Sequence, residues 1–236
     1  MQPFWSSWLA ATDLVMAADA RLLQVIALSL TVSGCATVIA TVLGTVTGAW
    51  LAVARFRGQR AMVVALNTLL GLPSVVVGLL VYLLLSRAGP LGSLGLLFTP
   101  AAMVIAQTIL TLPLVAALTR QLIADAHRGN GEQLRSMGAG TVGLAALLLV
   151  HERMGLITVL LTAFGRAVSE VGAVMIVGGN IDGVTRVMTT AIALETSKGE
   201  LALAMGLGLV LLVVVGSVNV AVALVQRLRP TEGLRR

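Results

Sequence analysis

Charged residues are scarce in this chain of 236 amino acids, where Asp, Glu, Lys and Arg together make up 11%. Soluble globular proteins carry about one quarter charged residues, so the composition excludes an ordinary water-soluble domain. Apolar residues account for 58% of the sequence, and the mean hydropathy is +1.00. We therefore expect an integral membrane protein.

Cysteine and lysine are almost absent, with one residue of each, Cys35 and Lys198. A single cysteine excludes a disulfide framework, and its place within an apolar run is typical of a small buried side chain. The sequence has no glycine-rich GxxxxGK[ST] phosphate loop, so the chain is not expected to hydrolyse ATP. His127 and His151 lie far apart, and no Ser, His and Asp arrangement is visible. We expect no catalytic residue, no metal site and no cofactor bound by this chain.

Five stretches with few or no charges reach the roughly 20 residues needed to cross a bilayer of about 30 Å. Each is continuously apolar and not alternating, which predicts helices in place of barrel strands. The expected spans are residues 22–54, 61–86, 97–119, 155–177 and 201–226. The predicted fold class is an all-α membrane protein with five transmembrane helices, and Gly44 and Gly48 in the first have the GxxxG spacing that permits close helix approach.

The net charge of +6 is sorted by loop and is not gathered on one soluble face, so we expect no nucleic-acid partner. Most arginines follow the first span, lie in loop 120–154 or lie in the tail 227–236. The opposite side carries Arg21, Arg87, Arg186 and Lys198. The positive-inside rule then predicts an outer N-terminus and a cytoplasmic C-terminus. Tryptophans near the start predict that residues 1–21 form an interfacial segment in contact with lipid.

The polar loop 120–154 contains a run of good helix formers between glycines. Gly129-Asn130-Gly131 precedes the run and Gly138 follows it, which predicts a short helix of about two turns with a flexible joint at each end. A partner protein could move such a helix as a rigid body, although a merely solvated loop is the alternative. The residues expected to contact the partner are Glu132, Gln133, Leu134, Arg135, Ser136, Met137 and Gly138.

Polar side chains inside the spans are the candidates for a transport path or gate. Arg166 and Glu170 lie one turn apart on one face of the fourth span, where they can neutralise each other. Asn67 and Gln107 precede the prolines Pro73 and Pro113, which are expected to kink their helices. Helix-to-helix contacts without a transport role are the alternative for all four side chains. 

Residues 178–200 are too polar and too short to cross the bilayer, so we expect an outer re-entrant or gate helix there. The full set of expected path or gate residues is Asn67, Gln107, Arg166, Ser169, Glu170, Thr185, Arg186, Thr189, Thr190 and Glu195.

The run Glu132-Gln133-Leu134-Arg135-Ser136-Met137-Gly138-Ala139 resembles the loop signature of ABC-importer permease subunits. Gln133 and Leu134 depart from the usual Glu-Ala-Ala. Residues 165–173 are similar to the segment that follows the coupling loop in molybdate, tungstate and sulfate importers, and residues 178–200 resemble the tungstate branch most closely.

The resemblance implies the smaller permease fold, with five core helices, working as a homodimer. It also implies a separate ATP-binding subunit dimer, which holds ATP and magnesium and grips loop 120–154, and an extracytoplasmic solute-binding protein. The implied cargo is an oxyanion, with tungstate first and molybdate or sulfate next. A passive channel and a structural or enzymatic membrane subunit are the alternatives from other classes. A channel predicts flux without an ATPase, and an enzyme predicts clustered catalytic residues.

Overall fold

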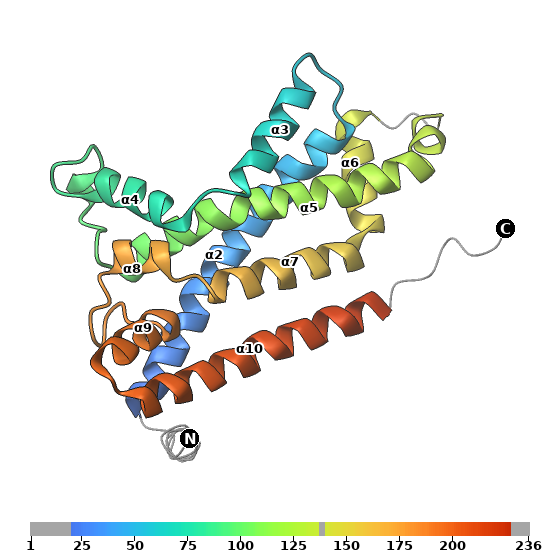
Figure 1. Cartoon of the computed structure of the whole chain (residues 1–236). Coiled ribbons are helices and arrows are strands. Elements are labelled where there is room, and N and C mark those ends of the chain that lie inside the picture. Colours follow the sequence, from blue (N-terminus) through green and yellow to red (C-terminus); the bar gives the residue numbers. More distant parts are fainter. Residues whose placement is uncertain (1–19, 137–139, 228–236) are drawn as a thin grey trace.

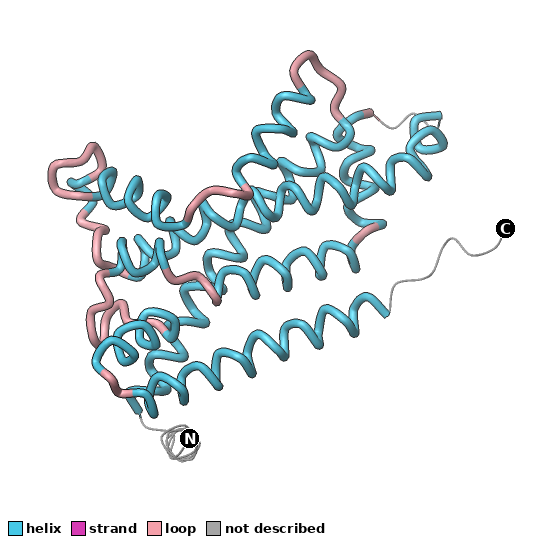
Figure 2. The backbone as a smooth tube through the Cα atoms, viewed as in Figure 1, coloured by secondary structure: helices cyan, strands magenta, loops and turns pink. Residues whose placement is uncertain are grey.

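The computed structural model describes residues 20–136 and 140–227, and no strand occurs within these ranges (Figures 1 and 2). The predicted all-α fold class is confirmed. Most of the interfacial segment and of the tail expected from the sequence lies outside the described residues. The elements are α2 (Ala20–Val53), α3 (Gln59–Leu69), α4 (Ser74–Leu85), a 3-10 turn η1 (Gly92–Leu94), α5 (Pro100–Ser136), α6 (Thr141–His151), α7 (Arg153–Val168), α8 (Gly172–Gly178), α9 (Met188–Lys198) and α10 (Leu201–Arg227).

The long helices α2 and α5 pack against each other at the centre of the molecule (Figure 1). A Cβ atom built on Gly44 would lie 2.8 Å from Cβ of Val115, and one on Gly48 would collide with the carbonyl oxygen of Ala116. The close approach expected from the GxxxG spacing is therefore confirmed. Cys35, also on α2, is exposed and not buried as its apolar surroundings suggested, because its side of the helix meets no other part of the described chain.

Three helical segments of the described chain are long and apolar enough to cross a membrane: α2, residues 100–129 of α5, and α10. Two bent pairs bring the total to five if each pair is one span. The first pair, α3 and α4, bends by 97° at Pro73, and the second, α6 and α7, bends by 77°. Proline lacks the N–H that would continue the helix, so the expected second span consists of two helices.

Pro113 and Gly129–Gly131 both lie inside α5, which runs through them without a break. The expected joint at Gly129–Gly131 is thus wrong, and residues 132–136 are the last turns of a long helix. A glycine inside a helix costs only about 1 kcal/mol relative to alanine, and a helix that is already formed propagates across it. Met137 and Gly138 lie outside the described residues.

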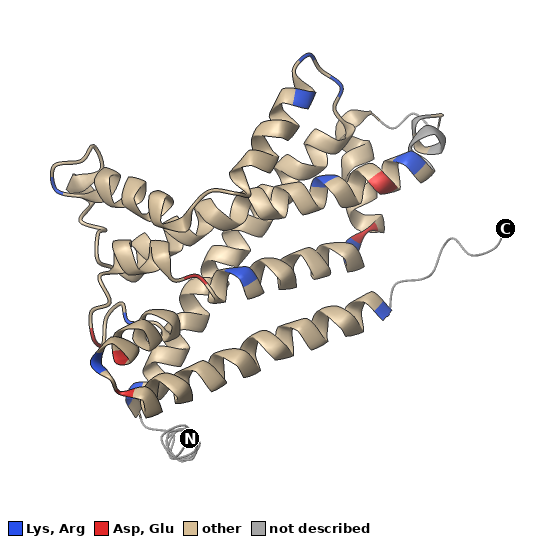
Figure 3. Cartoon of the chain, in the orientation of Figure 1, with Lys and Arg blue, Asp and Glu red and all other residues tan. Residues whose placement is uncertain are grey.

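The main hydrophobic core lies where α2, α4, α5 and α8 meet, with buried side chains such as Val32, Val77, Met103 and Val174. At one end of this body lie the start of α2, the loop between α4 and α5 and the loop between α8 and α9 (Figure 1). The other end holds the loop between α2 and α3, helix α6 and the last turns of α5 and α10. Charged residues gather mainly at these two ends (Figure 3).

Candidate functional site

The fourth expected span, residues 155–177, is interrupted between α7 and α8. Helix α7 ends at Val168 and α8 begins at Gly172, so three residues inside an apolar stretch lack regular helical hydrogen bonds. Non-helical backbone at membrane depth is tolerated where the protein satisfies the freed groups or a water-filled cavity does so. The break is therefore the first place to look for a function.

Two polar side chains from other helices satisfy the backbone at this break. The Nε2 atom of Gln107 on α5 donates to the carbonyl of Ala167 at 2.9 Å. The hydroxyl of Thr189 on α9 donates to the carbonyl of Glu170 at 2.8 Å. Both side chains are buried, so these two expected path residues are placed as supports of the broken helix.

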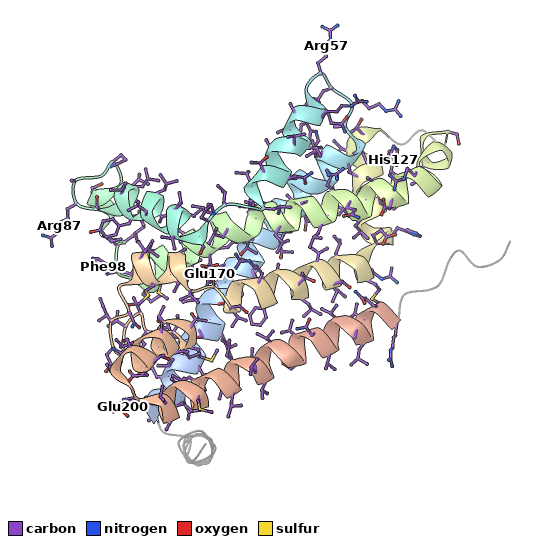
Figure 4. All side chains as sticks on the ribbon, in the orientation of Figure 1. Arg57, Arg87, Phe98, His127, Glu170 and Glu200 are labelled. Carbon is purple, nitrogen blue, oxygen red and sulfur yellow. The ribbon has the colours of Figure 1, made fainter. Side chains whose placement is uncertain are left out.

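Arg166 and Glu170 form the ion pair that their spacing indicates, with Nη1 of the arginine 2.7 Å from Oε2 of the glutamate. The two partners differ greatly in exposure: the glutamate side chain is 5% exposed and the arginine side chain 49%. The other carboxylate oxygen accepts the backbone N–H of Ala173 at 3.4 Å, and the side chain of Ser74 also hydrogen-bonds the carboxylate. Figure 4 shows Glu170 where α7 and α8 meet. The negative charge is thus turned into the protein and the positive charge outward.

The break at Pro73 lies against the break between α7 and α8. Ser74 is the first residue of α4, and a Cβ atom built on Gly172, the first residue of α8, would lie 2.8 Å from its Oγ. A Cβ atom on Gly78 would lie 2.7 Å from the Cα of Ala173. The starts of α4 and α8 therefore pack with almost no space between their backbones. Sequence reasoning missed Ser74, although its position directly after Pro73 was the available signal.

The threonines of the outer segment hold its backbone together. The hydroxyl of Thr185, which is fully buried, accepts the N–H of Ile181 at 2.9 Å and donates to the carbonyl of Gly178. The hydroxyl of Thr190 accepts the N–H of Val187 at 3.1 Å, which satisfies a free donor at the start of α9. Both hydroxyls therefore hydrogen-bond backbone atoms of their own segment in the described structure.

Arg186 and Glu195, the two charged path residues expected in the outer segment, each form an ion pair within that segment. Arg186 Nη1 lies 2.9 Å from Oδ1 of Asp182, and Lys198 Nζ lies 3.0 Å from Oε1 of Glu195. Among the remaining expected path residues, Ser169 is exposed at the break beside Arg166. Asn67 is exposed on α3, which packs against α5 and takes no part in the break.

A second candidate surface lies at the end of the molecule that holds the C-terminal turns of α5. Sequence reasoning included residues 141–151 only in the loop 120–154, whereas the structure makes them a separate helix, α6. Leu144 and Leu148 are buried against α2 and α5. Val142, 80% exposed, and Val150, 66% exposed, face away from the described chain. An amphipathic pattern was hidden because both sides of α6 are apolar.

Known proteins similar to this chain are permeases. It is 42% identical over 219 residues to the tungstate uptake system permease protein TupB of Peptoclostridium acidaminophilum, covering 92% of this chain and 95% of that protein. It is 40% identical over 185 residues to a probable anion ABC transporter permease protein of Haloferax volcanii, covering 76% and 80%. Identity to the molybdenum transport system permease protein ModB of Azotobacter vinelandii is 31% over 182 residues, covering 72% and 79%. No protein-family model matches the chain.

Proposed function

The chain belongs to the permease subunits of ABC importers, and from this premise we propose that it carries tungstate across the cytoplasmic membrane. The observation that supports tungstate as the cargo is the 42% identity, over nearly the whole of both chains, to a permease named for tungstate uptake. The relative named for molybdenum transport is more distant, at 31%. An anionic cargo also agrees with the outward guanidinium of Arg166 and the buried carboxylate of Glu170. Molybdate or sulfate is the alternative cargo.

We propose that ATP hydrolysis takes place on a separate subunit. The sequence has no phosphate loop, which supports a division of labour between this chain and an ATP-binding partner that holds ATP and magnesium. Two copies of the chain would face each other across the path, because five spans are too few to enclose a path with two gates. A solute-binding protein would deliver the oxyanion on the outer side.

The proposed contact with the ATP-binding subunit combines residues 132–138 with α6. The exposed valines Val142 and Val150 support this assignment, because an apolar surface at the charged end of the molecule indicates a protein partner. Replacing Gly138 by tryptophan should uncouple ATP hydrolysis from uptake while membrane insertion is preserved. Unchanged uptake in that variant would count against the contact.

The proposed topology places α6 and the C-terminus in the cytoplasm and the N-terminus outside. The charge bias in the sequence assigns Arg57, which follows the first span, to the inner side and Arg87 to the outer side. In support, the two residues lie at opposite ends of the molecule (Figure 4). The end that carries Arg57 also holds α6 and the last turns of α5, so the arginine-rich loops gather at one end.

Uptake of radioactive tungstate by cells that lack the chain tests the cargo directly. We expect uptake to be lost, to return when the chain is restored, and to be competed less well by molybdate and sulfate than by tungstate. A matched strain with an inactive partner ATPase separates an importer from a passive channel. Tungstate uptake that persists without the chain would refute the cargo, and uptake that persists without ATP hydrolysis would refute the importer.

A further inference from the structure

One side of α7 carries a polar stripe along the middle of the molecule. Thr158, Thr162, Arg166 and Ser169 are four, four and three residues apart, so they lie on one face of the helix. Thr162, Arg166 and Ser169 are exposed, and Thr158 is partly exposed. Polar groups that are exposed at membrane depth are expensive in hydrocarbon and normally face a bundle interior or water.

The two grooves that flank α7 differ in chemistry. The groove between α5 and α7, of about 300 Å³, has Leu118, Leu122 and Val159 in its wall. Its polar side chains are Gln121, Asp125, Thr158 and Thr162. The groove between α2 and α7, of about 400 Å³, is lined mainly by aliphatic side chains such as Val46 and Ile157. Helix α7 therefore carries polar groups among apolar ones on its side toward α5, whereas its residues toward α2 are aliphatic.

The hydrogen bonds along the stripe decide what it can offer to a solute. The hydroxyls of Thr158, Thr162 and Ser169 donate to carbonyls of the preceding turn at 3.3, 2.8 and 2.8 Å. Their protons are thus used, and their oxygens remain available only as acceptors, which suit water better than an anion. Asp125 is paired with Arg128 at the same end of α5.

Arg166 is the group on this face that can attract an anion. It has five N–H donors, and its hydrogen bond to Glu170 uses one nitrogen, Nη1. The carboxylate of Glu170 is held inside the protein by Arg166 and by the N–H of Ala173. The pair therefore presents its positive end outward on the polar face of α7, one turn beyond Thr162, although its net charge is zero.

We propose that the polar side of α7, with Gln121 of α5, lines the anion path, and that Arg166 selects for a tetrahedral oxyanion. Glu170 is the positioning residue that holds the guanidinium in place. A second copy related by a two-fold axis brings its own Arg166 to the same path, so that two guanidinium groups match a dianion. The inference rests on the proposed function, and it adds Gln121, Thr158 and Thr162 to the path.

Charge-selective labelling of introduced cysteines tests this assignment without using the cargo. In the assembled importer, Cys35→Ser removes the native thiol, and Thr162→Cys places a thiol in the groove between α5 and α7. Ile157→Cys is the matched control on the aliphatic side of the same helix. We expect Thr162→Cys to react with water-soluble methanethiosulfonates. It should react at least threefold faster with an anionic than with a cationic reagent, after correction for their rates with a free thiol. Ile157→Cys should react with neither.

Substitution of the ion pair then separates selection from positioning. Arg166→Gln, added to Thr162→Cys, should abolish the preference for the anionic reagent, and Arg166→Lys should retain part of it. Glu170→Gln removes the compensating negative charge but leaves Arg166, so the preference should be kept or increased while tungstate uptake falls because the guanidinium is no longer held in place. Glu170→Asp should restore uptake in part. The proposal is overturned if the two cysteines react alike, or if the preference survives Arg166→Gln. Failure of tungstate uptake to depend on the chain would refute the proposed cargo and leave the labelling result standing.

Discussion

Removal of the ion pair at the break between α7 and α8 should destabilise the protein unequally, depending on which partner is lost. Arg166→Ala leaves the carboxylate of Glu170, 5% exposed, without its cation. Breaking a buried pair from one side costs about 3–5 kcal/mol. We expect a smaller loss, about 2 kcal/mol, because Arg166 is half exposed and the N–H of Ala173 still donates to the carboxylate.

Glu170→Ala should cost less, about 1 kcal/mol, because the half-exposed guanidinium that remains can be hydrated. The double variant should lose less stability than the sum of the two single variants, since residues in contact are energetically coupled. The thermal midpoint of the purified importer in detergent is the measurement. At about 2–4 °C per kcal/mol for chains of this size, the midpoint should fall by roughly 4–8 °C for Arg166→Ala and 2–4 °C for Glu170→Ala.

The exposed pair of Arg128 and Asp125 provides the control, because both side chains are more than half exposed. Arg128→Ala should change stability by no more than about 0.5 kcal/mol. Additive losses for Arg166 and Glu170 would show that the two side chains do not act as a pair. A greater loss for Glu170→Ala than for Arg166→Ala would refute the conclusion that the carboxylate is the buried member.

Three further substitutions test other contacts. Gly48→Val at the crossing of α2 and α5 should lower stability by about 1–3 kcal/mol through overpacking. Gly34→Ala, with no atom within 4 Å of the new Cβ, should not lower the midpoint in the same thermal assay and should raise stability by up to about 1 kcal/mol, because alanine is favoured over glycine inside a helix. Thr189→Val keeps the shape of the side chain but leaves the carbonyl of Glu170 without that donor, so the midpoint should fall by an amount equivalent to about 1–2 kcal/mol. Val142→Asp should weaken copurification of the ATP-binding subunit at least fivefold without lowering the midpoint, and undiminished copurification would exclude α6 from the contact.

The position of Gln107 shows how tertiary contacts separate two uses of a polar side chain. Its amide inside an apolar span was compatible with a transport path or with a contact between helices. In the structure its Nε2 donates to the carbonyl of Ala167, 60 positions away in sequence, and the side chain is buried. Gln107 therefore stabilises the backbone at the break between α7 and α8. Any effect of this residue on transport would come from that contact and not from direct contact with the cargo.

Local patterns were sufficient where the structure depends on neighbours in sequence. The pairing of Arg166 with Glu170 follows from helical spacing, and the close approach at Gly44 follows from the small residues on one face of α2. The joint at Gly129–Gly131 was predicted wrongly, because glycine weakens a helix without dictating where it ends. Helix α6 was missed because its buried and exposed sides have the same apolar composition.

The sequence by itself determined a helical membrane protein with a charge pair in its fourth span, because hydrophobicity and helical periodicity are local properties of the chain. It also carried the likeness to ABC-importer permeases. Only the tertiary structure decided that Glu170 is buried while Arg166 is half exposed, and that Thr158 and Thr162 of α7 lie in a groove beside α5. Those outcomes depend on which faces of α2, α4, α5 and α8 cover α7 and its break, and helical periodicity does not specify which helices become neighbours.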